Sequence, residues 1–187
     1  NYRAVAPENF HFAYAVMDVL AEDQSDEVAL HWLGQDGTET RFTFDALKTY
    51  SDKAAGYFRA RGIGKGDMVM LVLKQRYQYW VCMLALHKIG AVAIPTTHLL
   101  SAEDFDYRLR AADVKMIVCA KDENVLKNVE SANAPHLQHK AVTDCLGAAP
   151  EGWLDFDGGV EETTDAWLRP EGPSATANED IMLMYFT

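Results

Sequence analysis

The sequence predicts an α/β fold, in which a mostly parallel β-sheet is flanked by helices in three layers and preceded by an early β-hairpin. Helical and strand-like patterns alternate from residue 43 to residue 143, which is typical of parallel strands joined by helical crossovers. Residues 68–73 are apolar at every position, as expected for a strand that is buried on both faces. The segment before residue 43 lacks this alternation and contains a turn between two short strand-like runs.

The first predicted elements are a helix and the hairpin. A helix is expected over residues 9–22, with Asn9 as its N-cap. Residues 28–33 and 40–42 are expected to pair as strands, because the residues at 35–37 (QDG) favour a turn between them. The apolar residues of the helix recur at near-helical spacing: Phe12, Val16, Val19 and Leu20.

Helices and strands then alternate. A helix is expected over residues 44–61, with Thr43 as its N-cap and Gly62 as its stop. The strand at 68–73 leads into a helix at 76–89 that is apolar almost all round, which predicts that this helix is buried. The remaining expected elements are a strand at 91–95, a helix at 102–112 capped by Ser101 and Asp104, a strand at 116–120, a helix at 122–131 and a strand at 140–143.

The last part of the sequence has a different character. Residues 145–180 are rich in Gly, Pro, Glu, Asp, Thr and Ala and lack strong periodicity, so we expect a long surface connection. Residues 181–187 resemble a buried strand that stops where a loop should begin. We therefore expect the 187 residues to be the front part of a larger protein, and we expect self-association through the apolar face that truncation leaves around helix 76–89.

Composition excludes several classes of function. The chain has 28 acidic and 17 basic residues, for a net charge of -11, and this excess argues against nucleic acid or anionic membranes as partners. No apolar run approaches the ~20 residues that span a bilayer, and no secretory signal is visible. The three cysteines, Cys82, Cys119 and Cys145, are far apart and form no C-x-x-C motif, which predicts reduced core cysteines in a cytoplasmic protein.

Several local patterns resemble functional motifs but have simpler explanations. The glycines of residues 61–66 follow a helix and precede a strand, whereas a phosphate-binding glycine loop follows a strand and opens a helix. His136 and His139 lack further ligands nearby in sequence, so we interpret them as solvated. Residues 96–100 follow a strand, where α/β proteins bind ligands, although a plain connecting loop is the favoured interpretation. An aromatic cluster is expected to form core and helix-packing surface: Tyr77, Tyr79 and Trp80.

A family resemblance rests on five segments in a fixed order. They are residues 41–47 (RFTFDAL), 62–67 (GIGKGD), 84–95 (LALHKIGAVAIP), 107–109 (YRL) and 185–187 (YFT). Together these segments resemble the adenylate-forming superfamily of AMP-dependent synthetases and ligases, specifically the acetyl- and medium-chain acyl-CoA synthetases. The resemblance covers roughly residues 9–187, and the order and spacing of the segments are more specific than any one of them.

The resemblance implies that residues 1–187 are the N-terminal portion of an AMP-binding domain. The parent enzyme would activate a small-molecule carboxylic acid with ATP and Mg²⁺ to an acyl-adenylate, and would then transfer the acyl group to coenzyme A. Thr187 would begin the loop that binds the ATP phosphates. The rest of that loop and the C-terminal domain with its catalytic lysine would follow residue 187, so no catalytic residue is assigned and residues 1–187 alone are expected to be inactive.

The resemblance also implies that coenzyme A lies near the loop after Pro95. Ungapped alignment places Leu99, beside His98, where the medium-chain subgroup has a glutamine. Leucine cannot make the hydrogen bonds of an amide side chain. This departure puts the polar contact in doubt and leaves apolar packing against the pantetheine arm.

Two alternatives stay open. The first is a non-enzymatic α/β module that binds a nucleotide-like ligand or a partner at the ends of its strands, and it requires Thr187 to be a natural terminus. The second is a dinucleotide-binding domain of an oxidoreductase. The second is disfavoured because no glycine fingerprint follows any predicted strand.

Overall fold

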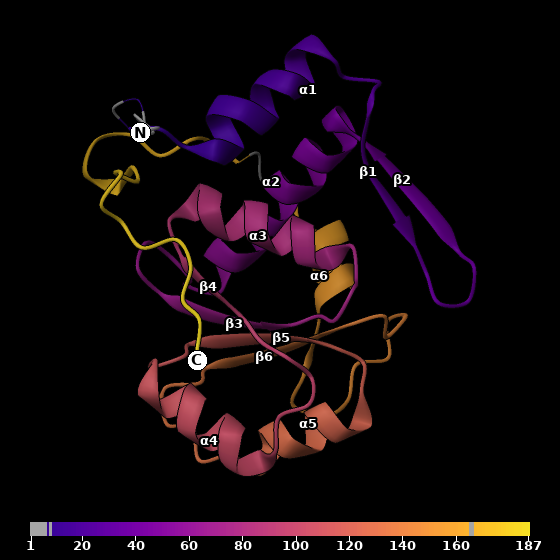
Figure 1. The fold of residues 1–187 in the computed structure, drawn as a ribbon, viewed down its shortest axis with the longest axis vertical. Coiled ribbons are helices and arrows are strands. Elements are labelled where there is room, and N and C mark those ends of the chain that lie inside the picture. The colour runs from indigo at the N-terminus through magenta and orange to yellow at the C-terminus, as the bar shows by residue number, and fades with distance from the viewer. Residues whose placement is uncertain (1–6, 8, 165–166) are drawn as a thin grey trace, which may run out of the picture.

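A five-stranded parallel sheet forms the centre of the molecule, as the computed structural model of residues 7, 9–164 and 167–187 shows (Figure 1). Its strands lie in the order β4-β3-β5-β6-β7, and each neighbouring pair is parallel. The strands are β3 (Met68–Val72), β4 (Val92–Pro95), β5 (Met116–Ala120), β6 (His139–Thr143) and β7 (Leu154–Asp155). The predicted α/β class is confirmed.

Helices cover both faces of this sheet. Figure 1 shows α2 (Phe44–Ala60), α3 (Gln78–Ile89) and α6 (Phe156–Glu161) above it, and α4 (Ala102–Ala111) and α5 (Glu123–Glu130) below it. Successive strand residues point to opposite faces, so β3 contributes to two cores. Val69 and Leu71 pack with α2 and α3, whereas Met70 and Val72 pack with α4 and α5. A strand covered on both sides must be apolar throughout, which is why β3 was recognisable from its sequence.

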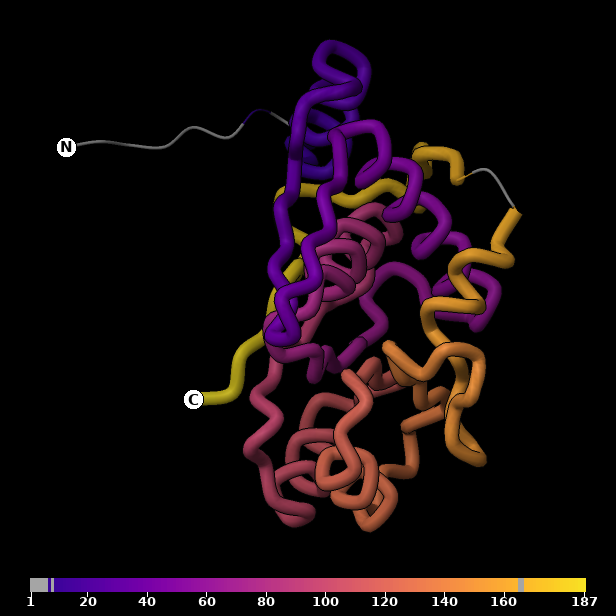
Figure 2. Tube along the Cα trace, turned by 90° about the vertical axis from the view of Figure 1, so that its right-hand side faces the viewer, coloured from indigo at the N-terminus to yellow at the C-terminus, as the bar shows by residue number. Residues whose placement is uncertain are grey.

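The N-terminal region contains a helix and the hairpin. The helix begins as a π-helix, η1 (Ala13–Asp18), and continues as α1 (Val19–Asp23). The hairpin pairs β1 (Val28–Leu33) with β2 (Glu39–Thr43) in antiparallel fashion, as predicted. In Figure 2 the hairpin and the C-terminal segment run along the same side of the molecule.

The prediction for the first helix is wrong in its start and in its buried face. Asn9 has a φ of +55° and precedes the helix by several residues, so it is not the N-cap. Phe12 and Val19 are 45% and 44% exposed. The π-helical turn bonds residue i to residue i+5, so its buried face departs from the 3.6-residue spacing assumed from the sequence. The residues that are buried instead are His11, Ala13, Tyr14 and Ala21.

The interval 145–180 is not irregular throughout. It contains β7 and α6, and Asp155 caps α6 by accepting a hydrogen bond from the Gly158 amide at 3.0 Å. These short elements were hidden by two adjacent glycines. Gly159 is required by close packing, because a Cβ there would lie 2.4 Å from the Tyr57 ring. The residues that anchor the interval in the core are Trp153, Phe156 and Val160.

The end of the chain is an extended segment beside the edge strand β4. Residues 181–187 were predicted to form a buried strand, but the segment forms a single parallel bridge, between Leu183 and Ala93. The Ala93 amide donates to Met182 O at 3.1 Å, and the Met184 amide donates to Ala93 O at 3.0 Å. The segment is only partly buried because strand pairing is present on one side of it. Phe186 nevertheless packs under α4, with the Arg108 guanidinium 5.4 Å from its ring centre.

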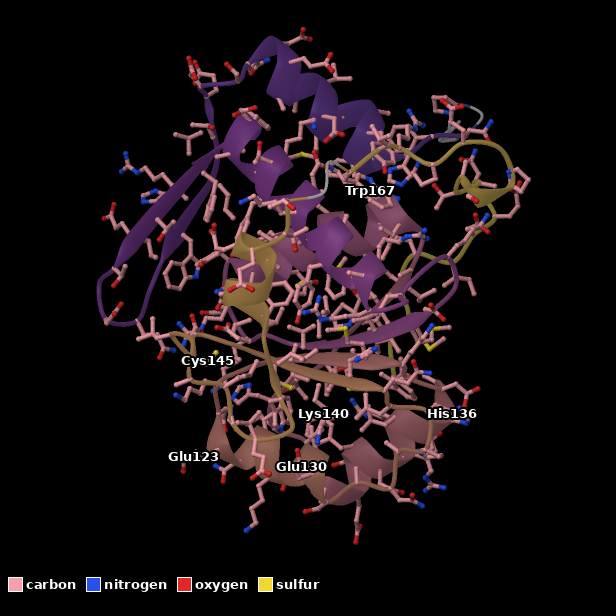
Figure 3. The ribbon with its side chains drawn as sticks, turned by 180° about the vertical axis from the view of Figure 1, so that it is seen from behind. Glu123, Glu130, His136, Lys140, Cys145 and Trp167 are labelled. Carbon is pink, nitrogen blue, oxygen red and sulfur yellow. The ribbon has the colours of Figure 1, made fainter. Side chains whose placement is uncertain are left out.

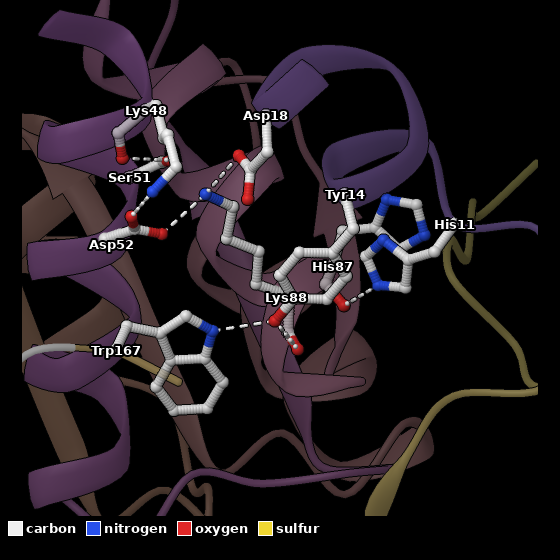
Figure 4. A network of polar contacts seen from close by, with 9 residues as sticks. All are labelled: His11, Tyr14, Asp18, Lys48, Ser51, Asp52, His87, Lys88 and Trp167. Carbon is white, nitrogen blue, oxygen red and sulfur yellow. Dashed lines mark hydrogen bonds and ion pairs between the residues drawn. The ribbon is translucent and has the colours of Figure 1, made fainter. Parts of the chain in front are cut away.

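A buried lysine joins the N-terminal helix to α2 and α3 (Figure 4). The Lys88 side chain is 0% exposed, and its Nζ lies 2.6 Å from Asp52 Oδ1 and 2.9 Å from Asp18 Oδ1. The Tyr14 hydroxyl donates to Lys88 O at 3.0 Å and accepts a hydrogen bond from Trp167 Nε1 at 2.7 Å. These contacts connect four separate parts of the chain.

Candidate functional site at the carboxyl edge of the sheet

A cavity of about 360 Å³ lies beyond the carboxyl ends of β3 and β4. Because all five strands are parallel, their carboxyl ends share one edge, which is where open α/β sheets usually bind ligands. The residues that line the cavity are Leu71, Leu73, Lys74, Tyr79, Pro95, Thr96, Thr97 and His98. The edge therefore combines an apolar floor with several hydrogen-bonding groups.

Lys74 is the cation of this cavity. It lies just after β3, separated from the strand by Leu73, and has a φ of +52°, a left-handed conformation that costs a non-glycine residue about 1 kcal/mol or more. Its Nζ lies 2.6 Å from Oδ2 of Asp122, which follows β5 and caps α5. The hydrogen bond from Lys74 lowers the pKa of Asp122. The charge of Lys74 is thus fixed in place and partly neutralised.

The loop after β4 supplies the other polar groups. The Thr96 amide donates to Leu71 O at 2.9 Å, and its hydroxyl donates to Ile94 O at 3.1 Å. The Leu99 amide donates to the Thr97 hydroxyl at 3.3 Å. His98 lines the cavity and is exposed, so of the two residues proposed to lie near coenzyme A it is His98 that faces this space. Leu99 is 79% exposed on the same loop.

The C-terminal segment reaches the same edge. It runs parallel to β4, so residues after the bridge at Leu183 approach the carboxyl end of that strand. Burial, together with the nearby Tyr185, raises the pKa of Tyr79, a residue that lines the cavity. Thr187, predicted to begin the phosphate loop, is exposed at the end of this segment.

Other residues singled out in the sequence lie elsewhere. His136 is at the periphery (Figure 3), 3.4 Å from Asp113, whereas His139 donates to Arg61 O at 2.9 Å. Within residues 7, 9–164 and 167–187, no group of three His, Cys, Asp or Glu residues is placed to hold a metal ion.

The predicted aromatic cluster divides between two environments. Tyr77 packs against Trp32 and Phe42, with ring centres 5.5 and 5.1 Å apart. Trp80 is 53% exposed, so it lies outside the core. It lies on the outer face of α3, beside a second cavity of about 380 Å³ that is almost entirely apolar. The residues that line this second cavity are Phe12, Met17, Ala29, Leu30, Leu47, Trp80, Met83, Leu84, His87 and Met182.

The sequence analysis missed Lys74, Asp122 and the role of Tyr79. The position of Lys74 directly after a central apolar strand was the available signal, because this position lies at the ligand-binding edge. Its pairing with Asp122 could not be foreseen, since the two residues are 48 positions apart.

The polar groups of the cavity at the carboxyl edge are suited to binding a ligand that accepts hydrogen bonds. An ammonium group, threonine hydroxyls and an imidazole can donate hydrogen bonds to phosphate oxygens or amide carbonyls. The cysteines offer no activated nucleophile, because all three are buried without disulfides and burial raises the pKa of each thiol. The donor set thus fits part of a nucleotide or a pantetheine arm.

Residues 17–187 match the family described as AMP-binding enzyme. The mitochondrial acyl-coenzyme A synthetase ACSM5 of Rattus norvegicus is 32% identical over 191 residues, which cover 97% of this chain and 31% of that protein. The human ACSM5 protein is 30% identical, with 99% of this chain and 32% of that protein covered. The chain therefore spans about a third of the length of these relatives.

Solved structures share the architecture. An acyl-CoA synthetase of Brucella canis matches with a TM-score of 0.78 and 22% identity over 95% of this chain and 31% of that one. The anthranilate CoA ligase AuaEII, in complex with anthranoyl-AMP, matches with a TM-score of 0.75 and 20% identity, over 95% of this chain and 31% of that one. At this level of identity the likeness establishes the fold.

Proposed function

Because this chain belongs to the AMP-binding enzyme family, we propose that the protein acts as an AMP-forming acyl-CoA synthetase. In the first step a carboxylate attacks the α-phosphorus of ATP and releases pyrophosphate, which gives an acyl-adenylate. In the second step the thiol of coenzyme A attacks the acyl carbon and releases AMP. The names of the curated relatives, which are acyl-coenzyme A synthetases, support this assignment.

The observation that carries the proposal is the family match over residues 17–187, together with where its segments lie. The segment 84–95 forms the end of α3 and all of β4, and Leu183 bridges Ala93 of β4, so the chain that leads into residues 185–187 runs along the same strand. Two segments far apart in the sequence thus meet at β4, whose carboxyl end belongs to the edge where α/β proteins usually bind ligands.

We assign roles at this edge as part of the proposal. Thr187 would contact the ATP phosphates, and His98 and Leu99 would lie near coenzyme A. The donors of Lys74 and Thr97 fit a ligand with several hydrogen-bond acceptors. Mg²⁺ would arrive with the ATP phosphates, since Mg²⁺ is usually held by one or two carboxylates together with substrate phosphates.

Residues 1–187 on their own are proposed to be inactive. They correspond to 31% of the rat relative, and phosphoryl-group chemistry requires donors that surround the charge formed during reaction. The described edge offers only part of such a set.

The test is acid-dependent exchange of pyrophosphate into ATP, followed by acyl-CoA formation, with a panel of carboxylic acids. Protein made from the complete gene should catalyse both, and residues 1–187 should catalyse neither. The alternative of a non-enzymatic module predicts binding of ATP or coenzyme A without turnover by the complete gene product. Turnover by residues 1–187 alone would refute the proposed inactivity.

The compartment is a separate question. The named relatives are mitochondrial, so the cytoplasmic location expected from the cysteines stays a prediction. Across the part of the chain that the structure describes, no helix is long and apolar enough to cross a bilayer.

A further inference from the structure

A third cavity, of about 550 Å³, lies at the opposite edge of the sheet from the candidate site. Lys65, which lines it, precedes β3, and Ile89 precedes β4, so the cavity is at the amino edge of these parallel strands. Arg59, Trp167 and Arg169 also line it. No segment of the family resemblance assigns a ligand to this edge.

The lining of this amino-edge cavity is cationic. Arg59, Lys65 and Arg169 contribute positive charge, and no carboxylate is among the described residues that line the cavity. Three cations gather here in a chain with a net charge of -11 and only 17 basic residues, and the carboxylate of Asp180 pairs with one of them, Lys65. A cavity of this sign concentrates anions.

The three cationic side chains differ in whether a carboxylate neutralises them. Lys65 Nζ lies 2.7 Å from Asp180 Oδ2 and donates to Ala175 O at 2.8 Å. For Arg59 and Arg169, no carboxylate of the described residues lies within 4.0 Å. Two guanidinium groups therefore retain donors for a ligand, and their planar forks match phosphate oxygens.

One wall of the cavity is fixed by the buried network of Figure 4. The Arg169 guanidinium lies 4.7 Å from the centre of the Tyr14 ring. Tyr14 is held in turn by hydrogen bonds to Trp167 and to the backbone of Lys88. On the other side, Arg59 belongs to the last turn of α2. The contacts of Tyr14 and the position of Arg59 on α2 thus hold two sides of the cavity in place, which reduces the entropy lost when a ligand binds.

We propose that the amino-edge cavity binds an anion carrying one or two phosphate groups, independently of the nucleotide proposed at the carboxyl edge. Two guanidinium groups with no carboxylate partner among the described residues, beside the paired ammonium group of Lys65, match a multiply charged anion better than a single carboxylate. The volume is sufficient for pyrophosphate with part of its hydration shell.

The experiment is a calorimetric titration of the 187-residue chain with inorganic phosphate and with pyrophosphate, at low and high salt. In parallel, NMR follows the indole N–H signals, of which that of Trp167 should shift. The variant R59Q/R169Q should bind pyrophosphate about tenfold more weakly or worse, because two charge-assisted contacts are lost. The matched control R41Q/R110Q removes the same charge from exposed arginines that pair with Glu39 and Asp106, and it should change the affinity less than twofold.

Several outcomes would overturn the proposal. They are no binding by the wild type at millimolar pyrophosphate, equal weakening in the control, and citrate bound as tightly as pyrophosphate. Loss of binding in K74Q would instead locate the anion at the carboxyl edge, so the result is separable from the proposed enzymatic function. If R59Q/R169Q fails to fold, the variant R59K/R169K replaces it. This variant keeps both positive charges and removes the planar guanidinium groups, so an unchanged affinity for pyrophosphate would also contradict the proposal.

Discussion

Lys88 has a charge that the fold buries completely, and it can be tolerated only because Asp18 and Asp52 lie within 3 Å of its ammonium group. Asp52 has a second cation, since Lys48 Nζ lies 2.6 Å from its Oδ2. Among the described residues, Asp18 has Lys88 as its one ion-pair partner, so compensation of its charge depends more heavily on Lys88 than that of Asp52 does. The network therefore secures the N-terminal helix to α3.

Replacing Lys88 with methionine should lower the free energy of unfolding by about 3 kcal/mol, because partly buried carboxylates lose their partner. Urea denaturation measures the change. The control R110M breaks an exposed pair with Asp106 on α4 and should cost less than about 0.5 kcal/mol. Equal losses of unfolding free energy in K88M and R110M would show that burial of the Lys88 charge does not increase its effect on stability.

Two stacked imidazoles lie next to this network, with the ring centres of His11 and His87 3.8 Å apart. Burial and the neighbouring His11 lower the pKa of His87 from 6.5 to about 4. Between these values the unfolded chain binds more protons than the folded chain. The free energy of unfolding should therefore decrease as the pH falls from about 6.5 towards 4.

The variant H87Q should reduce the slope of stability against pH in this range, as measured by urea denaturation at several pH values. His11, whose pKa burial also lowers, should account for part of the slope that is left. H136Q is the control, because His136 is at the surface, and it should keep the wild-type slope. A wild-type slope in H87Q would exclude the stacked pair as its source.

At the residue level, local chemistry was predictable and burial of charge was not. Thr43 and Ser101 were identified as N-caps, and both accept the expected backbone hydrogen bonds. Such caps depend on neighbours three residues away. Lys88 lies in the segment 84–95, but no partner for its charge could be predicted, because Asp52 is 36 positions away in the sequence.

Elements whose periodicity extends over several turns or over a whole strand were predicted well. The helix α2 and the strands β3 and β5 have the expected bounds within one residue. The π-helix, the six residues of α6 and the single bridge of residues 181–187 were predicted poorly. Each of these elements is too short or too irregular to have a recognisable periodicity in the sequence. Its conformation depends on tertiary contacts with other parts of the chain.

The turn between α3 and β4 can be tested at Gly90, which has a φ of +73°. A Cβ at this position would lie 2.8 Å from Thr176 Cγ2. G90A should lower the free energy of unfolding by about 2 kcal/mol or more, from backbone strain and crowding together.

The control for this variant is G37A. Gly37 has a φ of +84°, but a Cβ added there would have no neighbouring atom within 4 Å, so only the backbone strain of about 1 kcal/mol is expected. Thermal or urea denaturation measures the loss of stability in each variant. The difference between the two losses is the energetic cost of the contact between the added Cβ at position 90 and Thr176. If G90A is no less stable than G37A, the crowding against Thr176 has no energetic effect.

For the whole molecule, the sheet is covered on both faces, yet apolar area remains exposed on the outer side of α3. Phe12, Trp80 and Met182 border the second cavity and are each at least 40% exposed. Exposed apolar patches of this kind favour association. The sequence predicted self-association through this helix, and that expectation stays a prediction.

We expect the 187-residue chain to dimerise at high concentration, as sedimentation equilibrium would show. W80E should weaken the dimer at least about tenfold, because it places a charge in an apolar contact. L146E changes a fully exposed leucine elsewhere and should have no effect. A strict monomer at every concentration would contradict the prediction, as would equal effects of the two variants.

The bridge between Leu183 and Ala93 also has a consequence for how the sheet is protected while the chain is made. An unshielded border strand exposes amides and carbonyls to which another copy can add in a growing fibril. Residues 182–184 occupy that border at β4, and they are translated after every helix and strand described above. During synthesis this border therefore stays open until residues 182–184 have emerged, and a chaperone that covers extended chain would protect it in that interval.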